Sequence, residues 1–449
     1  MEEANVKILG IVAEYNPFHN GHMYHIEQAR KLSHSDCVIC IMSGNFIQRG
    51  EPAIVNKWAR AEMAISCGVD LVIELPSVYA CNSAEFFAYG AVKILDSLGI
   101  VDDLCFGSEA GSIDELSVIA KVLVSEPEEY KGVLKTYLKA GLSFPSARQA
   151  ALEDYLSNYS KGMLLSPILS QALASPNSIL GIEYLKALIR LNSPIRPLMI
   201  KRISNSYNSE TLTGMFSSAT SIRKSIETNA RIMTGIDIIQ GGKLDNGKED
   251  IQIDGKNVKL SIAMPDQSLK ILLKEFKCGR GPVFPSNYEQ AMLADLRRIS
   301  STALANIAGI SEGFENRLKK AASLSGSYAS LIETLITRRY PKTRIQRNII
   351  NILAGISQQD LHMFKLYGGP QYARVLGFNA SGRRLLSLMK SSSSLPIITR
   401  ASKFKKSCNP LLTRMLEIEE LLTDLYVLGY SNPQMRYGGQ EFTSNLVLK

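Results

Sequence analysis

Four short apolar runs alternate with helical segments over the first 110 residues, and this alternation limits the possible folds more than any other feature of the chain. The apolar runs are VKILGIVAEY, DCVICIMSG, VDLVIELP and VDDLCFGSE. Helical periodicity marks the segments near residues 22 to 33, 56 to 67 and 82 to 98. Strands joined by helices form parallel sheets, because each connection must cross one face of the sheet. The sequence therefore predicts an α/β fold with a doubly wound, Rossmann-like parallel sheet.

The chain divides into two halves of opposite charge. Residues 1 to 230 contain 20 Lys and Arg against 24 Asp and Glu, a net charge of −4, whereas residues 231 to 449 contain 31 against 18, a net charge of +13. We expect a catalytic domain over residues 1–230, a linker or insertion over 231–264, and a mainly α-helical basic domain over 265–449. The basic half indicates a nucleic acid or another polyanion as partner, although a solvated basic face would give the same count.

Three local patterns refine this division. A further strand, IRPLMIKRI, and a helix at SSATSIRKSIE complete the first domain. Between residues 231 and 260, the Asp254-Gly255 pair marks a possible hairpin. The periodicity from about residue 265 to 392 is helical.

Composition excludes several classes of protein. The seven cysteines are odd in number and mostly lie in apolar surroundings, so a disulfide framework is not expected. Cys37 and Cys40 form a C-x2-C spacing inside a predicted strand, with no second pair at zinc spacing, so no metal site is expected there. The chain has no run of 18 apolar residues, and its N-terminus, MEEANVK, is acidic where a signal peptide would be basic. We expect a cytoplasmic protein without a membrane segment, and nothing in the sequence indicates its oligomeric state.

Three of the five histidines lie within seven positions, directly after the first predicted strand. In NPFHNGHMYH, His19 and His22 are three residues apart, so their imidazoles can share one side of a first helical turn, and Gly21 lets the backbone approach a ligand. Ligands of open parallel sheets bind at the carboxyl ends of the strands, where backbone N–H groups and a helix dipole are available. This turn is a candidate triphosphate site, although a single histidine there would be explained by helix capping.

The H-x-G-H pattern resembles the signature of the nucleotidylyltransferase superfamily, which includes the class I aminoacyl-tRNA synthetases. In that superfamily the histidines bind the triphosphate and stabilise charge while the α-phosphorus is attacked. A second pattern, SSATSIRKS, places Ser218, Thr220 and Arg223 at a helix start, where they can hold the β- and γ-phosphates. Taken alone, this second pattern is explained equally well by a helix that Ser or Thr caps and that carries basic residues. The resemblance implies catalytic roles for His19, His22 and Arg223.

Longer blocks of the chain resemble one family, the bacterial tRNA(Met) cytidine acetate ligases. The blocks are GIVAEYNPFHNGHMYHI, IMSGNFIQRGEPAIVNKWARAEMAI, DLVIELP, SAEFFAYGAVKILDSLGIVDDLCFGSE, SPNSILGIEYLKAL, IKRI, SSATSIRK and RRYPKTRIQR. The resemblance implies an enzyme that activates acetate with ATP as acetyl-adenylate and transfers the acetyl group to N4 of the wobble cytidine of elongator tRNA(Met). Mg²⁺ is expected to accompany the triphosphate.

The resemblance also implies which residues contact ATP. They are Gly107, Asn177, Arg202, Ser218, Thr220 and the continuous segment Ile11, Val12, Ala13, Glu14, Tyr15, Asn16, Pro17, Phe18, His19, Asn20, Gly21, His22, Met23 and Tyr24. Gly107 would leave room for an adenosine, Asn177 would bond ribose or base, and Arg202 would neutralise phosphate. Without the resemblance, these three would be read as a strand-end turn, an N-cap and a solvated arginine. The chain departs from the family pattern at Asn208, where a histidine is usual.

Polar residues also follow the second predicted strand, in SGNFIQRGEPA. Asn45 or Arg49 in this segment can hold acetate or the cytosine, since the segment lies at the ligand-binding edge of the predicted sheet. An ordinary polar loop is the alternative interpretation.

A basic segment in the second half is the candidate tRNA-binding surface. TRRYPKTRIQR contains Arg338, Arg339, Lys342, Arg344 and Arg347. Guanidinium groups match phosphate geometry, and Tyr340 among them can stack on an unpaired anticodon base. A solvated helix face is the alternative.

Two other functions are compatible with these residues. An adenylyltransferase of a small phosphorylated metabolite would leave the basic half unexplained, and a non-catalytic tRNA- or ribosome-binding factor would leave His19, His22 and Arg223 unexplained. ATP–pyrophosphate exchange separates the three, because it should depend on acetate only in the ligase.

Overall fold

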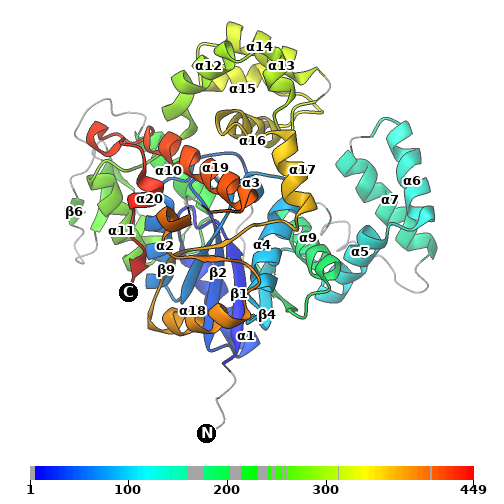
Figure 1. The fold of residues 1–449 in the computed structure, drawn as a ribbon, viewed down its shortest axis with the longest axis horizontal. Coiled ribbons are helices and arrows are strands. Elements are labelled where there is room, and N and C mark those ends of the chain that lie inside the picture. The colour runs from blue at the N-terminus through cyan, green and yellow to red at the C-terminus, as the bar shows by residue number, and fades with distance from the viewer. Residues whose placement is uncertain are drawn as a thin grey trace.

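The computed structural model contains a central mixed sheet surrounded by helices (Figure 1). It describes residues 6–142, 144–159, 173, 175–202, 214–230, 241–243, 249–253, 256–258, 260–311, 313–404 and 407–449. The predicted parallel strands are present as β1 (Ile8–Ala13), β2 (Cys37–Ser43), β3 (Leu71–Leu75), β4 (Asp103–Ser108) and β5 (Arg196–Lys201). Their order in the sheet, β3-β2-β1-β4-β5, confirms the doubly wound arrangement.

The helices that connect these strands cover both faces of the sheet. The predicted connections appear as α1 (Asn20–Ser33), α2 (Lys57–Ser66) and α4 (Ala84–Leu98), with a short α3 (Ser77–Ala80) before α4. A helical extension between β4 and β5 contains α5 (Ile113–Ser125), α6 (Glu128–Lys139), α7 (Phe144–Tyr159) and α9 (Pro176–Leu191). In Figure 1, α6 and α7 project to one side of the sheet.

The second half of the chain adds strands to the same sheet, which the sequence did not indicate. β9 (Ala373–Phe378) lies in the range expected to be helical and pairs antiparallel with β3. β10 (Ile397–Ile398) and β11 (Val447–Leu448) pair with β9 in parallel. Most of β9 is buried, and a short, continuous apolar run does not distinguish a buried strand from a buried helix by periodicity. The sheet therefore draws on both halves of the chain.

The remaining helices form two groups (Figure 1). Away from the sheet lie α12 (Glu289–Arg298), α13 (Ser301–Ala305), α14 (Phe314–Leu324), α15 (Tyr328–Leu335) and α16 (Lys342–Leu353), followed by α17 (Gln358–Leu366). Nearer the sheet lie α10 (Ala219–Ala230), α11 (Asp266–Lys277), α18 (Ala380–Ser392), α19 (Pro410–Val427) and α20 (Gln440–Thr443).

A small antiparallel sheet lies within the predicted linker. It consists of β6 (Gly241–Lys243), β7 (Glu249–Ile253) and β8 (Lys256–Val258). The pairing of Ile253 with Lys256 confirms the hairpin predicted around Asp254-Gly255, although these two residues and Asn208 lie outside the described residues.

All seven cysteines are free thiols, as expected, and Cys37 and Cys40 are buried within β2. Among the described residues, no helix is both long and apolar enough to cross a membrane.

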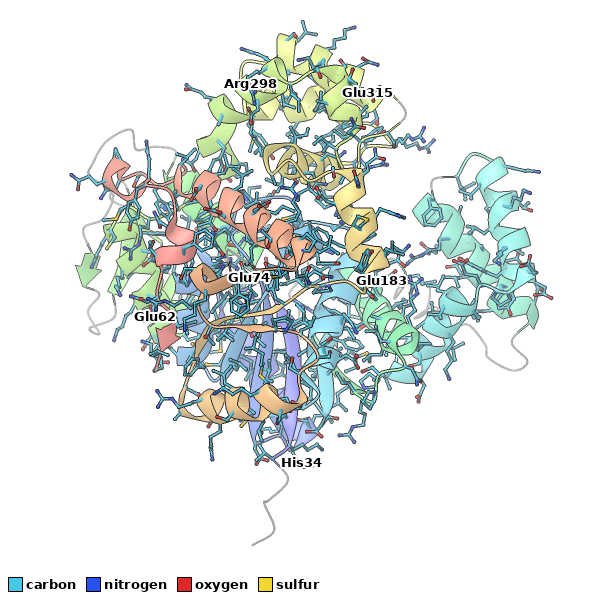
Figure 2. All side chains as sticks on the ribbon, viewed as in Figure 1. His34, Glu62, Glu74, Glu183, Arg298 and Glu315 are labelled. Atoms are coloured by element: carbon cyan, nitrogen blue, oxygen red, sulfur yellow. The ribbon has the colours of Figure 1, made fainter. Side chains whose placement is uncertain are left out.

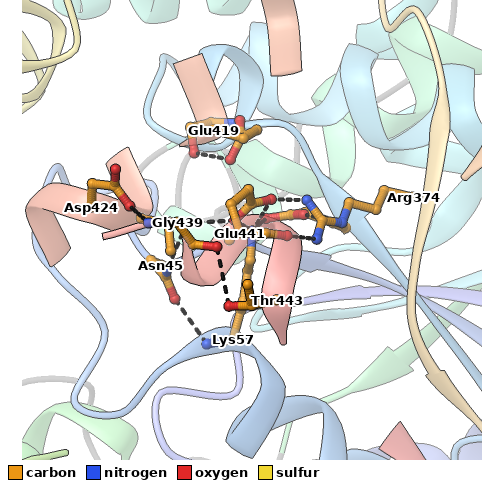
Figure 3. Close-up of polar contacts among 12 residues, drawn as sticks. Asn45, Lys57, Arg374, Glu419, Asp424, Gly439, Glu441 and Thr443 are labelled. Carbon is orange, nitrogen blue, oxygen red and sulfur yellow. Dashed lines mark hydrogen bonds and ion pairs between the residues drawn. The ribbon is translucent and has the colours of Figure 1, made fainter. Parts of the chain in front are cut away.

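A buried cluster of charged residues joins the C-terminal helices to the sheet (Figure 3). Lys57 Nζ lies 2.6 Å from Glu74 Oε1 and 2.7 Å from Glu441 Oε2, and all three side chains are fully buried. Arg374 also pairs with Glu441, and Glu419 accepts hydrogen bonds from the backbone and hydroxyl of Ser77. Figure 2 shows Glu74 near the middle of the molecule. Paired charges therefore connect β3, β9, α2 and α20, and hydrogen bonds from Ser77 attach α19 to the cluster.

Glu419 makes the stability of the protein depend on pH. Burial, and then the Glu74 carboxylate, raises the pKa of Glu419 to about 7. Because the folded state raises this pKa, the stabilising contribution is complete below the unfolded-state pKa and is lost as the pH rises through about 7. Relative to Glu419→Gln, the wild-type protein is expected to lose stability as the pH rises from about 5 to 8, and the difference between the melting temperatures of the two proteins would measure this. Glu417→Gln, an exposed change on the same helix, should keep the wild-type pH dependence, and an equal pH dependence for both variants would contradict the assignment.

Candidate active site

The predicted ATP-contacting elements meet where the strand order of the sheet reverses. β1 pairs with β2 on one side and with β4 on the other, which creates a crevice at the carboxyl ends of β1 and β4. The histidine turn follows β1, Gly107 is the second-last residue of β4, and Arg202 follows β5. His34 caps the opposite end of α1 and lies at the far end of the sheet (Figure 2). The structure thus separates the clustered histidines from the one at the other end of α1.

His19 and His22 form a reciprocal cap at the start of α1. His19 Nδ1 accepts a hydrogen bond from the Gly21 N–H at 3.0 Å, and His22 Nδ1 accepts from the His19 N–H at 3.2 Å. The two rings are stacked with centroids 3.7 Å apart. A neutral imidazole whose Nδ1 accepts carries its proton on Nε2. The helix start therefore leaves each histidine with an Nε2–H donor.

Burial keeps these imidazoles neutral. It is the main cause that lowers the pKa of His19 to about 3, with smaller contributions from the charges of Arg202 and Arg223. The pKa of His22 is likewise well below its ordinary value, chiefly because of burial. The charges of Arg202 and Arg223 act on the pKa of His19 because the fold brings together residues about 200 positions apart in the sequence. The positive charge of the site therefore comes from the arginines, and the histidines supply neutral hydrogen-bond donors.

His25, the third histidine of the cluster, belongs to the same environment. Burial, and then Arg202, lowers its pKa to about 4, and its Nε2 is buried without a hydrogen-bond partner among the described residues. The sequence patterns above predict no role for His25. Its spacing of three residues from His22 on a helix was the signal that could have identified it.

Gly21 is required by the position of His19. A Cβ at this position would lie 2.9 Å from His19 Cε1, closer than atoms can approach without a shift. We expect Gly21→Ala to displace the imidazole and to raise the KM for ATP by about tenfold or more, since small misplacements in active sites have large effects on rate. Steady-state kinetics would measure this. Gly132→Ala on α6, where a Cβ meets nothing within 4 Å, is the control, and equal KM values for both variants would contradict this explanation.

Gly107 and Asn177 lie beside the crevice, and each lies against a neighbouring side chain. A Cβ at Gly107 would lie 3.0 Å from Arg202 Cγ, so this glycine makes room for the arginine side chain. Asn177 Nδ2 donates to the Glu109 carboxylate, which also accepts from the Ser178 N–H at 3.2 Å. Glu109, which sequence reasoning missed, thus caps the start of α9 and orients Asn177.

The second phosphate-binding candidate begins at α10. Ser218 Oγ accepts from the Ser221 N–H at 3.1 Å and caps the helix, whereas Thr220 is exposed. Arg223 Nη1 donates to the Asn16 carbonyl at 2.7 Å. Arg223 therefore joins α10 directly to the histidine turn.

The loop after β2 holds its polar residues in different ways. Both ends of the Asn45 amide are occupied, because Nδ2 donates to Thr423 Oγ1 at 3.1 Å and Oδ1 accepts from the Lys57 N–H at 2.9 Å. Asn45 therefore attaches this loop to α19 and to the start of α2 by hydrogen bonds. Arg49 is partly buried. Arg60, which sequence reasoning missed, is fully buried and donates to the carbonyls of Glu14 and Gly44, which ties this loop to the histidine turn.

The basic segment surrounds the start of α16. Arg338, Arg339 and Lys342 are exposed, and Arg344 and Arg347 are partly buried. The expectation that Tyr340 stacks on an RNA base is wrong. Tyr340 is only 6% exposed, because Phe314 stacks on its ring at 3.9 Å and the Arg344 guanidinium lies 4.5 Å from the ring centre. Tyr340 is therefore part of the helical core.

Comparison with known proteins places this geometry in a family. The model of the HIGH Nucleotidyl Transferase family matches residues 6–441. The tRNA(Met) cytidine acetate ligase of Acetivibrio thermocellus is 50% identical over 99% of this chain and 100% of its own length. The enzyme of the same name from Halothermothrix orenii is 42% identical over 97% of this chain and 98% of its own length. The chain belongs to the tRNA(Met) cytidine acetate ligase family.

Solved structures agree with this assignment to the acetate ligase family. Thermotoga maritima TmcAL bound with alpha-thio ATP is 36% identical and superimposes with a TM-score of 0.86 over 99% of both chains. The apo form gives a TM-score of 0.88 with the same identity and coverage. The predicted fold class and family are therefore confirmed, and the chain is an enzyme of the ligase class.

Proposed function

We propose that this protein activates acetate with ATP as acetyl-adenylate and transfers the acetyl group to N4 of the wobble cytidine of elongator tRNA(Met). The observation that carries the proposal is the pair of stacked, neutral imidazoles at the start of α1, beside Arg202 and Arg223. The names of its relatives support the choice of acetate and tRNA(Met).

The first step is an attack of an acetate oxygen on the α-phosphorus of ATP, with pyrophosphate as the leaving group. Negative charge grows on the phosphate oxygens during this step, so hydrogen-bond donors held in place beforehand stabilise the transition state. The Nε2–H groups of His19 and His22 and the N-terminal end of α1 are such donors. Arg223 and Arg202 add positive charge for the triphosphate.

The second step is an attack of the cytidine N4 amine on the acetyl carbonyl carbon. A nitrogen–carbon bond forms, the bond from the carbonyl carbon to the phosphate oxygen breaks, and AMP leaves with that electron pair. One proton of the amine must also move to a base. The product is N4-acetylcytidine.

Mg²⁺ enters this proposal together with the triphosphate. In the part of the chain that the structure describes, no group of three or more His, Cys, Asp or Glu side chains could hold a metal ion. We propose that the phosphate oxygens supply most of the Mg²⁺ ligands, and that the enzyme acts in the cytoplasm, where its tRNA substrate is found.

The exposed arginines of the basic segment are proposed to bind tRNA phosphates. We expect the double variant Arg338→Ala/Arg339→Ala to bind tRNA more weakly. The slope of log affinity against log salt concentration should become smaller by about 1 to 2, which corresponds to the loss of one or two phosphate contacts. Binding measured at several salt concentrations would test this. The control is Lys131→Ala/Lys135→Ala on α6. An unchanged salt slope in the Arg338/Arg339 variant would contradict the proposal that these arginines bind tRNA.

Purified protein incubated with ATP, labelled acetate and bacterial tRNAs tests the whole proposal. We expect label in elongator tRNA(Met) and an ATP–pyrophosphate exchange that requires acetate. Exchange that requires a phosphorylated metabolite instead of acetate would identify an adenylyltransferase. Binding of tRNA without any exchange would identify a non-catalytic factor.

A further inference from the structure

A cavity of about 360 Å³ lies between α10 and the helices α15 and α16. Its walls include Glu51, Phe284, Tyr328 and Gln346. Its volume is near the lower end of the range of about 300–1,000 Å³ found for small-molecule sites. None of the functional steps described above assigns an occupant to this cavity.

Asn16 places the cavity beside the histidine turn. Arg223, which lines the cavity, donates to the Asn16 carbonyl, and the Ile54 N–H, three residues after Glu51, donates to Asn16 Oδ1 at 2.8 Å. The Asn16 Nδ2 group is buried and has no hydrogen-bond partner among the described residues. Arg223 and the chain that follows Glu51 therefore connect the wall of the cavity to the histidine turn through Asn16.

The cavity also borders the basic segment. Ile336 and Lys342 line it, and the chain between them carries the exposed Arg338 and Arg339. Arginines that bind phosphates of an RNA loop would hold that loop next to the cavity. Sequence-specific RNA recognition commonly takes unpaired bases out of loops into such pockets.

The side chains that line the cavity suit a neutral base better than an anion. Among the described residues that line the cavity, Glu51, Glu227 and Glu333 contribute three carboxylates, against the two cations Arg223 and Lys342. This balance disfavours phosphate or acetate as the occupant. Phe284 and Tyr328 provide rings on which a base can stack.

Glu51 is held in a defined orientation by its neighbours. Gln346 Nε2 lies 2.9 Å from Glu51 Oε1 and 2.9 Å from the Tyr328 hydroxyl, and it donates to both. A carboxylate is the group that accepts hydrogen bonds from the exocyclic amine of cytosine. Glu51 therefore presents the acceptor that this amine requires.

We propose that this cavity binds the cytosine that accepts the acetyl group, and that the Glu51 carboxylate accepts a hydrogen bond from N4 and takes its proton during transfer. The inference rests on the proposed function, of which it specifies the second step. As N4 bonds to the acetyl carbon and AMP leaves, the displaced proton passes to Glu51. Uracil has a carbonyl oxygen in place of the amine, so the carboxylate would repel it.

Separate assays of the two steps test the proposal with Glu51→Gln, which keeps the size of the side chain and an acceptor for Gln346. Acetate-dependent ATP–pyrophosphate exchange, which precedes binding of the cytosine, should stay at its wild-type value. Single-turnover transfer from enzyme-bound acetyl-adenylate to tRNA(Met) should fall by about 100-fold or more, which is the usual effect of losing a general base. Glu51→Asp should retain more transfer activity than Glu51→Gln, and Glu315→Gln on α14 is the control.

Cross-linking locates the base independently. A tRNA(Met) with 5-iodocytosine at the wobble position should cross-link to the peptide containing Phe284 or Tyr328. Three results would overturn the assignment of the cavity to the cytosine. They are a wild-type rate of transfer by Glu51→Gln, an equal loss of exchange and transfer in that variant, and a cross-link to a peptide elsewhere in the chain. If the wild-type protein itself shows no acetate-dependent exchange, the proposed function fails instead.

Discussion

Replacing His22 with alanine is expected to lower acetate-dependent ATP–pyrophosphate exchange by about 100- to 1,000-fold, the usual cost of losing one fixed donor to a developing oxyanion. Two effects combine in this variant. The Nε2–H donor disappears, and the His19 N–H loses the acceptor that completes the cap of α1. Because His19 stacks on the His22 ring at 3.7 Å, its own donor also loses its support. Exchange measured at saturating ATP and acetate would give the size of the loss.

The loss of the cap must be separated from the loss of catalysis. Removal of a cap costs about 0.5–2 kcal/mol, which thermal unfolding would detect without explaining a large rate effect. His34→Ala, at the opposite end of α1, changes a histidine far from the crevice and should retain wild-type exchange. If His22→Ala retained exchange similar to that of His34→Ala, the histidine turn would not be the activation site.

Replacing Lys57 with methionine is expected to reduce the free energy of unfolding by about 3–5 kcal/mol, because removal of one partner from a buried ion pair leaves an uncompensated charge. Lys57 is fully buried between Glu74 and Glu441. In the variant, Arg374 is the cation that still faces both carboxylates. Burial outweighs the neighbouring carboxylates and lowers the pKa of Lys57 to about 8, so the pairing only partly compensates for desolvation. Urea unfolding at neutral pH would measure the change.

Two further variants test this explanation. Lys131→Met removes an exposed lysine that pairs with Glu128 on α6 and should leave stability unchanged. Adding Glu441→Gln to Lys57→Met removes one uncompensated carboxylate, so the double variant should be more stable than Lys57→Met alone. Additive destabilisation by the two changes would show that Lys57 and Glu441 do not interact.

The parts of the fold that could be predicted depend on short-range patterns. β1 to β5 and their connecting helices follow from apolar runs and helical periodicity, and the predicted boundaries lie within a few residues of those observed. The sequence predicts helix where β9 forms, since the pairing of β9 with β3 joins residues about 300 positions apart. A buried strand inside the sheet has no local sequence signal that distinguishes it from a buried helix.

Some residues of the candidate site could be predicted from the sequence, and others could not. His19 and His22 were indicated by their spacing and by their place after the first strand, and Arg223 by its place at a helix start. Arg60 and Glu109 were not, because their importance comes from the carbonyls and amides that surround them in the folded chain. Tyr340 lies among basic residues in the sequence, as an RNA-stacking residue would, but Phe314 covers its ring in the folded chain.

The sequence by itself determined the strand and helix order, the start of α1 at the histidine turn and the concentration of basic residues in the second half. These properties depend on near neighbours: side-chain periodicity, helix capping and charge. Only the tertiary structure decided that Arg223 contacts Asn16, that Lys57 is paired with Glu441 and that Glu51 lines a cavity with Tyr328. Such contacts join segments more than 200 residues apart, and they form only when both segments pack against the same sheet or helix.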